Sequence, residues 1–250
     1  MRFTARKVLA IAACAVTIGG IAAAGTMQAA QAATPSCGNS CLDVFSHDFG
    51  TFAQPQFVLD AYKRGQSVGT PLILFRASNS DPAEDFTVAN QGTVADFFAA
   101  GLVSPQVALH YGCTTPAFPV CTAPQLVDRQ AYELEYAPYG ADTGLCAGVA
   151  TVAANGTKIS LQPCGVSSRT VWIDAAEDSP STISVPLING SDTNFSHPYV
   201  ATYPGGSFPT DQPRPQLYVS SLTGFSNGNG PELGSVSDTQ LWAWDTGKLF

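Results

Sequence analysis

The glycine-rich run Gly224-Phe225-Ser226-Asn227-Gly228 is the first candidate for chemistry, because it matches the G-x-S-x-G pattern of serine hydrolases. In that pattern the serine stands on a sharp turn between a strand and a helix, and a histidine later in the chain takes its proton. Here Pro231 follows closely and would break a helix. The last histidine is His197, so the order serine, acid, histidine cannot be built. We therefore predict a glycine-rich turn.

Carboxylates offer a second kind of chemistry. Glu133 and Glu135 would share one face of a strand, and a carboxylate pair hydrolyses glycosides when its members flank a cleft. The cluster of Asp81, Glu84 and Asp85 could hold a calcium ion. A solvated strand face and a solvated turn are the plainer interpretations, and we expect them here.

Histidine chemistry has little support in the sequence. His47-Asp48 could form an acid–base pair or a metal site, but the H-E-x-x-H spacing of zinc enzymes is absent. The sequence also contains no phosphate loop and no dinucleotide fingerprint. We expect a protein without catalysis, metal or cofactor. A hydrolase would need a cleft that holds several of Asp43, His47, Glu133 and Glu135.

The amino terminus predicts export from the cell. Arg2, Arg6 and Lys7 precede an apolar run at 8–25, and Ala30-Gln31-Ala32 is an A-x-A cleavage signal. We predict a signal peptide at 1–32 and a secreted, extracellular protein of bacterial type that begins at Ala33. No other apolar run is long enough to span a bilayer, so no membrane insertion is expected after cleavage.

Composition narrows the class of partner. The chain has 11 Lys and Arg against 19 Asp and Glu, and three of the basic residues lie in the predicted signal peptide. This acidic balance argues against nucleic acid and against anionic membranes. Only 12% of residues are charged, and short apolar runs alternate with Gly, Pro, Asn and Ser clusters along the chain. The pattern is typical of strands and turns, and it disfavours a parallel α/β fold.

Residues 144–173 carry the clearest structural signal. They read as a strand, an Asn155-Gly156 turn, a strand, a loop and a strand, with Cys146 and Cys164 on the first two strands and Trp172 on the third. This segment resembles one repeat of the ricin-B-type β-trefoil. Two other segments end in a similar way, one at Phe86 and one at Gln240-Leu241-Trp242, which matches the family's Gln-x-Trp signature.

The resemblance implies an all-β protein, a single β-trefoil over residues 33–250. Three repeats would pack around a pseudo-threefold axis, since one repeat alone cannot bury its apolar face. We expect the repeats at about 37–95, 131–178 and 199–250, with long insertions at 51–69, 97–136 and 179–213. A β-sandwich, which also alternates short strands and turns, is the alternative fold.

Cysteine usage agrees with export, because six cysteines remain after signal removal and an even number implies disulfides. The family's repeat joins its two cysteines, which implies a bond between Cys146 and Cys164. Cys113 pairs with Cys121 across a short loop in our interpretation. The third pair is then Cys37 with Cys41.

The resemblance also implies where a sugar would bind. In the lectin family each binding repeat supplies an Asp on its first strand, an aromatic platform after its middle strand and an amide near the closing aromatic. These roles fall on Asp43 and Phe75 in repeat one, and Gln240 keeps the amide in repeat three. Repeat two has Gly148 and Gln162 where the Asp and the aromatic should stand.

We therefore expect a monomeric, secreted, non-catalytic binding protein that lacks a working sugar site and interacts with a secreted or cell-surface protein; a glycan is the partner in the alternative. The first alternative is a carbohydrate-binding module with one weak site in repeat one. The second is a secreted hydrolase.

Overall fold

The structure is a computed structural model. It describes residues 37, 41–46, 50–51, 54–78, 80–115, 118–121, 130–175, 184–193, 197–205, 215–224 and 235–246. The chain divides into two units, Met1–Ala33 and Thr34–Phe250, and every described residue belongs to the second. The predicted signal peptide, His47 and Ser226 lie outside the described residues. Within the described part, no helix has the length and apolar character needed to cross a membrane.

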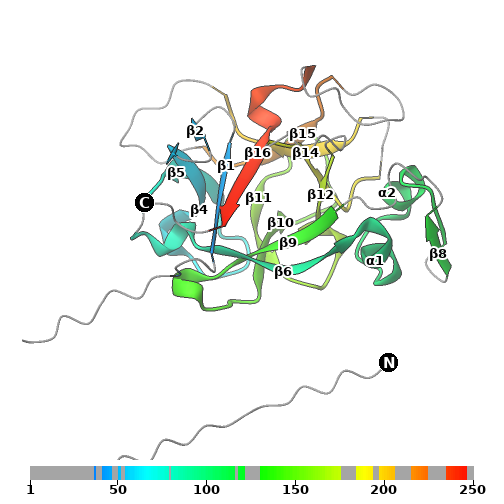
Figure 1. The fold of residues 1–250 in the computed structure, drawn as a ribbon, viewed down its shortest axis with the longest axis horizontal. Coiled ribbons are helices and arrows are strands. Elements are labelled where there is room, and N and C mark those ends of the chain that lie inside the picture. The colour runs from blue at the N-terminus through cyan, green and yellow to red at the C-terminus, as the bar shows by residue number, and fades with distance from the viewer. Residues whose placement is uncertain are drawn as a thin grey trace, which may run out of the picture. The chain divides into compact units, whose positions relative to one another are not determined.

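Six strands form a closed antiparallel ring (Figure 1). Along the chain they are β1 (Leu42–Ser46), β6 (Phe86–Thr93), β9 (Gln130–Tyr136), β12 (Trp172–Asp174), β13 (Leu187–Asn189) and β16 (Trp242–Thr246). Each of the first four strands pairs with the next one in this order. A single bridge between Val185, just before β13, and Trp242 connects β13 to β16. Strand β16, red in Figure 1, runs beside β1 and closes the barrel.

Three hairpins meet at one end of this barrel. They are β4 (Phe57–Ala61) with β5 (Leu72–Arg76), β10 (Leu145–Val149) with β11 (Ile159–Pro163), and β14 (Tyr199–Thr202) with β15 (Tyr218–Ser221). Single bridges link each hairpin to the other two, at Pro71 with Ser160, Ile73 with Gln216, and Lys158 with Tyr218. A six-stranded barrel with three mutually bridged hairpins is a β-trefoil, so the predicted all-β trefoil is confirmed and the sandwich is excluded.

The third repeat begins earlier than the sequence indicated. Its first strand is β13, at Leu187–Asn189, whereas we expected the repeat to start near residue 199. A strand of three residues is too short to show the alternation of apolar and polar side chains that marks a strand in a sequence. Residues 199–202 instead form β14, the second strand of this repeat.

The core shows how the three repeats share one interior. Trp172 and Trp242 are buried, and their indole N–H groups donate to the carbonyls of Ala147 and Ala201, each at 2.9 Å. Phe86 occupies the equivalent place in repeat one, since it pairs with β1 as Trp172 pairs with β9. The position equivalent to the two alanines is Leu59 there. The larger Leu accompanies the smaller aromatic ring, and each larger ring accompanies an Ala.

The segment between β6 and β9 builds a second apolar cluster against the barrel. It contains α1 (Val94–Ala99), α2 (Pro105–His110), β7 (Cys113–Thr115) and β8 (Phe118–Cys121), which gather to one side of the barrel in Figure 1. Thr93 and Asp96 form a capping box on α1, and Ser104 caps α2 ahead of a proline, which is why both helices begin where they do. Phe97, Phe98 and Val107 pack with Ile173 and Ile188 of the barrel. A hairpin of β2 (Gly50–Thr51) and β3 (Gln54–Pro55) precedes β4.

Disulfides join Cys37 to Cys41 and Cys146 to Cys164, as predicted. Cys113 is also disulfide-bonded, and the backbone register sets it opposite Cys121, whose side chain lies outside the described part of the structure.

Candidate functional site

A cavity of about 250 Å³ opens beside the β4–β5 hairpin of repeat one. Two short 3-10 helices flank it, η3 (Tyr62–Arg64) after β4 and η4 (Pro82–Glu84) before β6. Its lining combines charged side chains with two aromatic rings and includes Asp60, Tyr62, Lys63, Arg64, Phe75 and Asp81. Phe75, the predicted aromatic platform, thus lies at a cavity.

Asp60 is the buried acid of this cavity. Its side chain sits on β4 at 4% exposure and has no hydrogen-bond partner among the described residues. Burial raises the pKa of this carboxyl to about 7; the negative charge of Asp81 adds to the effect, and Arg64 opposes it. An unpartnered buried carboxyl is costly to maintain, and such groups gather at sites that bind or react.

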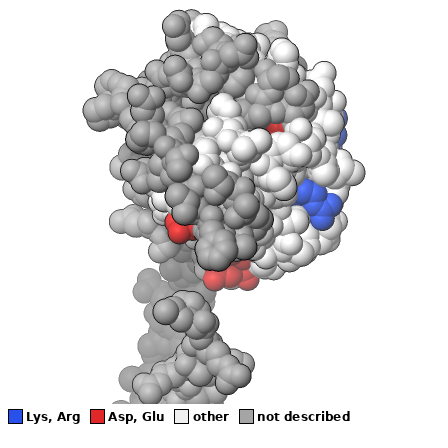
Figure 2. Space-filling model, turned by 90° about the vertical axis from the view of Figure 1, so that its right-hand side faces the viewer, with Lys and Arg blue, Asp and Glu red and all other residues white. Residues whose placement is uncertain are grey.

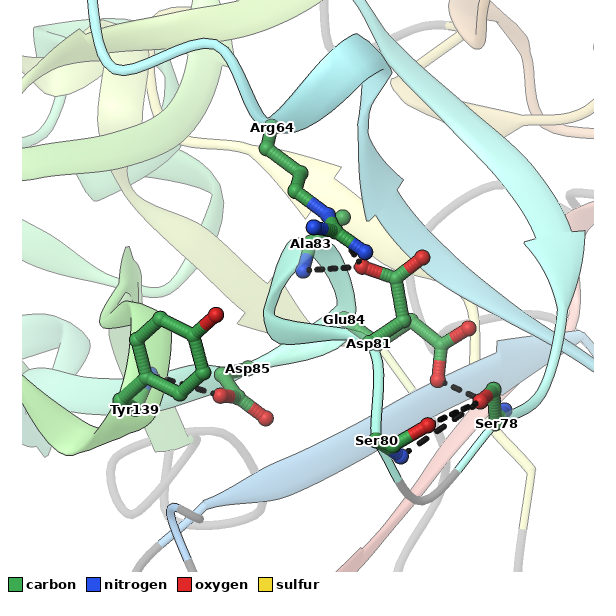
Figure 3. Close-up of polar contacts among 8 residues, drawn as sticks. All are labelled: Arg64, Ser78, Ser80, Asp81, Ala83, Glu84, Asp85 and Tyr139. Atoms are coloured by element: carbon green, nitrogen blue, oxygen red, sulfur yellow. Dashed lines mark hydrogen bonds and ion pairs between the residues drawn. The ribbon is translucent and has the colours of Figure 1, made fainter. Parts of the chain in front are cut away.

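Arg64 and Asp81 form an ion pair at the mouth of the cavity (Figure 3). Arg64 Nε lies 3.0 Å from Asp81 Oδ1, and the two side chains are 58% and 24% exposed. The same carboxylate oxygen accepts the Ala83 N–H at 3.0 Å and so caps η4. Hydrogen bonding and the charge of Asp81 raise the pKa of Arg64 further above its usual value. The Arg64 guanidinium is therefore already ion-paired with Asp81.

The backbone that carries these cations is strained. Lys63 and Arg64 adopt φ of 56° and 57°, in the left-handed region that residues with a Cβ seldom occupy. Strain of this kind costs of order 1–3 kcal/mol per residue and clusters at functional sites. The Lys63 ammonium lies over the Tyr62 ring, 5.2 Å from the ring centroid.

The strand registers explain why the acid is Asp60 and not Asp43. Val58, Cys146 and Val200 occupy the same position in the three repeats, since each pairs with the first strand of its own repeat. Two residues further on, Asp60 is therefore the counterpart of Gly148. Asp43 belongs instead to barrel strand β1, is 5% exposed and is not part of the cavity lining. The expected pairing of Asp43 with Phe75 in one site is thus not what the structure shows.

A signal for Asp60 was present in the sequence. Val58-Leu59-Asp60-Ala61 stands nearly as far before Phe75 as Cys146-Ala147-Gly148-Val149 stands before Gln162. Asp43 was assigned this role as the Asp on the first strand of the repeat, and it does lie on that strand, β1.

The corresponding places in the other two repeats are filled by protein. In repeat two a Cβ on Gly148 would lie 2.8 Å from the Arg169 carbonyl oxygen, so no side chain fits there. In repeat three the counterparts of Asp60 and Phe75 are Thr202 and Ser220, whose hydroxyls hydrogen-bond at 2.7 Å. Among the described residues, repeat one alone combines an acid and an aromatic ring at this position.

Gln240, the third predicted sugar residue, holds a loop. It is 2% exposed and accepts the Thr223 N–H at 2.9 Å, while its amide nitrogen donates to Ser220 Oγ and the Ser221 carbonyl, also at 2.9 Å. Glu84 does the same in repeat one, where it accepts the Ser78 N–H at 2.9 Å (Figure 3). Both side chains close the loop that follows the third strand of their repeat.

Glu133 and Glu135 are not a solvated strand face, and that prediction is wrong. They are 0% and 8% exposed. Glu133 accepts the Gly165 N–H at 2.9 Å and also binds Thr170 and Asn90. Glu135 accepts the Gly144 N–H. Glu133 thus replaces in repeat two the loop closure that Gln240 supplies in repeat three, whereas Glu135 holds the segment that leads into β10.

The acidic cluster likewise departs from a solvated turn. Glu84 and Asp85 are 1% and 2% exposed, and Asp85 accepts the Tyr139 N–H at 2.7 Å (Figure 3). Among the described residues, the single group with metal-site spacing is Cys37, Cys41 and Asp85, and both of its cysteines are in a disulfide.

Figure 2 shows one face of the molecule, where few described side chains are charged. In a chain of which 12% of residues are charged, the lining of the cavity contains Asp60, Lys63, Arg64 and Asp81.

No protein-family model matches the chain, and none of the curated proteins does either. Among solved structures, the chain is similar to the designed threefold-symmetric protein ThreeFoil, with a TM-score of 0.48 and 10% identity over 82% of this chain and 97% of that one. It is also similar to a mosquitocidal holotoxin, with a TM-score of 0.46 and 12% identity over 83% of this chain. The matched part is 17% of the holotoxin chain.

Proposed function

We propose that this chain is a secreted, non-catalytic carbohydrate-binding protein with a single site in repeat one. The observation that carries the proposal is that Asp60 and Phe75 line one cavity. A carboxyl group hydrogen-bonds sugar hydroxyls, and an aromatic face packs on the apolar face of a sugar ring. Repeats two and three lack both groups at the equivalent positions.

Export rests on the predicted signal peptide, and the disulfides agree with it, since such bonds persist outside the reducing cytosol. A non-catalytic role is favoured because Asp81, the second acid of the cavity, caps η4 and pairs with Arg64. An acid held in this way is poorly placed to attack or to activate water at a glycosidic bond.

The test is a glycan array, extended with insoluble polysaccharides, probed with the exported protein, residues 33–250. Phe75→Ala removes the stacking face and should weaken binding about five- to thirtyfold, since a good stacking contact is worth roughly 1–2 kcal/mol. Gln162→Ala changes the equivalent position in repeat two and should leave binding unchanged. Both variants are first compared with wild type by circular dichroism and thermal melting.

Two results would count against the proposal. Binding that Phe75→Ala leaves intact would place the site elsewhere. Release of reducing sugar from a bound oligosaccharide would show that the protein is an enzyme.

A further inference from the structure

Asp60 lacks a positive partner of its own. The cation that lowers its pKa, Arg64, is already paired with Asp81 at 3.0 Å. The negative charge of Asp81 raises the pKa of the Asp60 carboxyl by more than Arg64 lowers it, so these two neighbours together disfavour ionisation. A buried carboxylate in such surroundings is stabilised by any cation that reaches it, because screening by water is weak there.

The other groups that face Asp60 do not supply this charge. Asp60 interacts electrostatically with Arg64 on η3, with Asp81 before η4 and with the phenol of Tyr136 on β9. Lys63 also lines the cavity, but its ammonium is placed over the Tyr62 ring. The positive groups around the cavity are thus engaged with other side chains, and a ligand can supply the missing counter-charge.

We propose that the repeat-one cavity selects sugars that carry a protonated primary amine, with the ammonium group against the Asp60 carboxylate. This inference rests on the proposed carbohydrate-binding function. An ammonium group donates up to three hydrogen bonds, and a bond between two charged partners is about twice as strong as a neutral one. A hydroxyl at the same ring position offers one neutral donor, and an acetylated amine has lost its charge.

Selectivity for an amine should be visible in the number of protons that the protein releases when it binds a sugar. In the free protein the Asp60 carboxyl, with its pKa of about 7, is mostly protonated at pH 6. An ammonium ligand favours the ionised form, so binding at pH 6 should release a proton to the buffer. A neutral sugar that accepts a hydrogen bond from the protonated acid should release none. The number of protons released therefore separates charge recognition from ordinary hydrogen bonding.

The experiment uses three oligosaccharides of the same length and linkage that differ only at carbon 2: glucosamine, glucose and N-acetylglucosamine. Binding to the exported protein is measured by calorimetry at pH 6 in two buffers of different ionisation enthalpy. We expect glucosamine to bind roughly tenfold or more tightly than glucose, with close to one proton released. Asp60→Asn, which keeps the shape of the side chain, should equalise the two affinities and abolish proton release.

The outcomes separate this inference from the function on which it rests. If neutral sugars bind as well as glucosamine and Phe75→Ala weakens all of them, the carbohydrate site stands and amine selectivity is wrong. If Asp60→Asn binds glucosamine with the same preference as wild type, Asp60 is not the selecting group. If no sugar of this series or of the array binds, both proposals fail. Asp60→Glu serves as a second charged variant and should keep part of the preference.

Discussion

At the scale of single residues, Asp60 is a carboxyl group buried where its charged form is disfavoured. Other buried carboxylates, such as Glu84, Asp85 and Glu133, accept backbone N–H groups. Asp60 has no such donor among the described residues. Burial without compensation disfavours the charged form, so Asp60 is retained at a cost to stability. Such a cost is understandable if the carboxyl serves a ligand.

This cost predicts a pH dependence of stability. The pKa of Asp60 is about 7 in the folded state, against 3.8 as its ordinary value, so the folded state binds the proton more tightly than the unfolded state does. Protonated Asp60 therefore stabilises the folded state. This contribution to the free energy of unfolding is fully present below about pH 4 and is lost as the pH rises through about 7. By linkage it amounts to about 4 kcal/mol, as an order of magnitude.

Asp60→Asn should therefore gain unfolding free energy over wild type as pH rises from 4 to 8. Urea unfolding of both proteins across this range measures the difference in unfolding free energy. The difference removes the contributions of other titrating groups that both proteins share, such as His110, because burial lowers the pKa of His110 to about 4. A difference that stays constant with pH would mean that Asp60 titrates as an ordinary acid.

At the scale of elements, each repeat holds the loop after its third strand through a hydrogen bond from that loop to a buried side chain. The tie is Glu84 to Ser78 in repeat one, Glu133 to Gly165 in repeat two and Gln240 to Thr223 in repeat three. The Gln of the Gln-x-Trp signature thus has a structural task here. In repeat two Thr170 stands at that position, and Glu133 reaches the loop from β9 instead.

We predict that Gln240→Leu destabilises the protein without weakening sugar binding. It removes the hydrogen bonds to the Thr223 N–H and to the Ser221 carbonyl, which are part-buried, and a bond of this kind contributes about 0.5–1.5 kcal/mol to stability. The loss should appear in urea unfolding, while the neighbouring exposed Asp238→Asn should change stability by less than about 0.5 kcal/mol. A folded Gln240→Leu protein that has lost glycan binding would restore Gln240 as a ligand residue.

At the scale of the whole molecule, the three repeats share one core in which a larger aromatic ring goes with a smaller neighbouring side chain and a smaller ring with a larger one. Trp172 and Trp242 each accompany an alanine, while Phe86 accompanies Leu59. Close packing makes such exchanges interdependent, since an added or missing ring has to be accommodated by neighbours.

Phe86→Trp alone should therefore lower the unfolding free energy by about 1–3 kcal/mol through overpacking, and Leu59→Ala alone by about 2–5 kcal/mol through a cavity. The double variant should be more stable than the sum of the two changes predicts, by at least about 1 kcal/mol. Chemical denaturation of the four proteins completes the cycle. Strict additivity would show that the two positions do not compensate each other.

The trefoil was predictable mainly from repeat two, where Cys146, Cys164, Asn155-Gly156 and Trp172 are local signals. The site was predictable only in part. Phe75 lies at the cavity, and the spacing of Asp60 before Phe75 was a signal for the acid. The assignment is fixed only by the pairing of Phe45 with Val58, because no local pattern determines the register between two strands. Burial of Glu133 and Glu135 could not be inferred either, because it depends on loops that fold back from other parts of the repeat.

The most direct measurement is an amide chemical-shift titration of the isotopically labelled protein with the sugar that binds best on the array. We expect the shifts to concentrate on β4, β5, η3 and η4 around Asp60 and Phe75, with one sugar bound per chain, and we expect the hairpins of repeats two and three to stay unchanged. Shifts centred on the β10–β11 or β14–β15 hairpin, or two or three sugars bound per chain, would contradict a single site in repeat one.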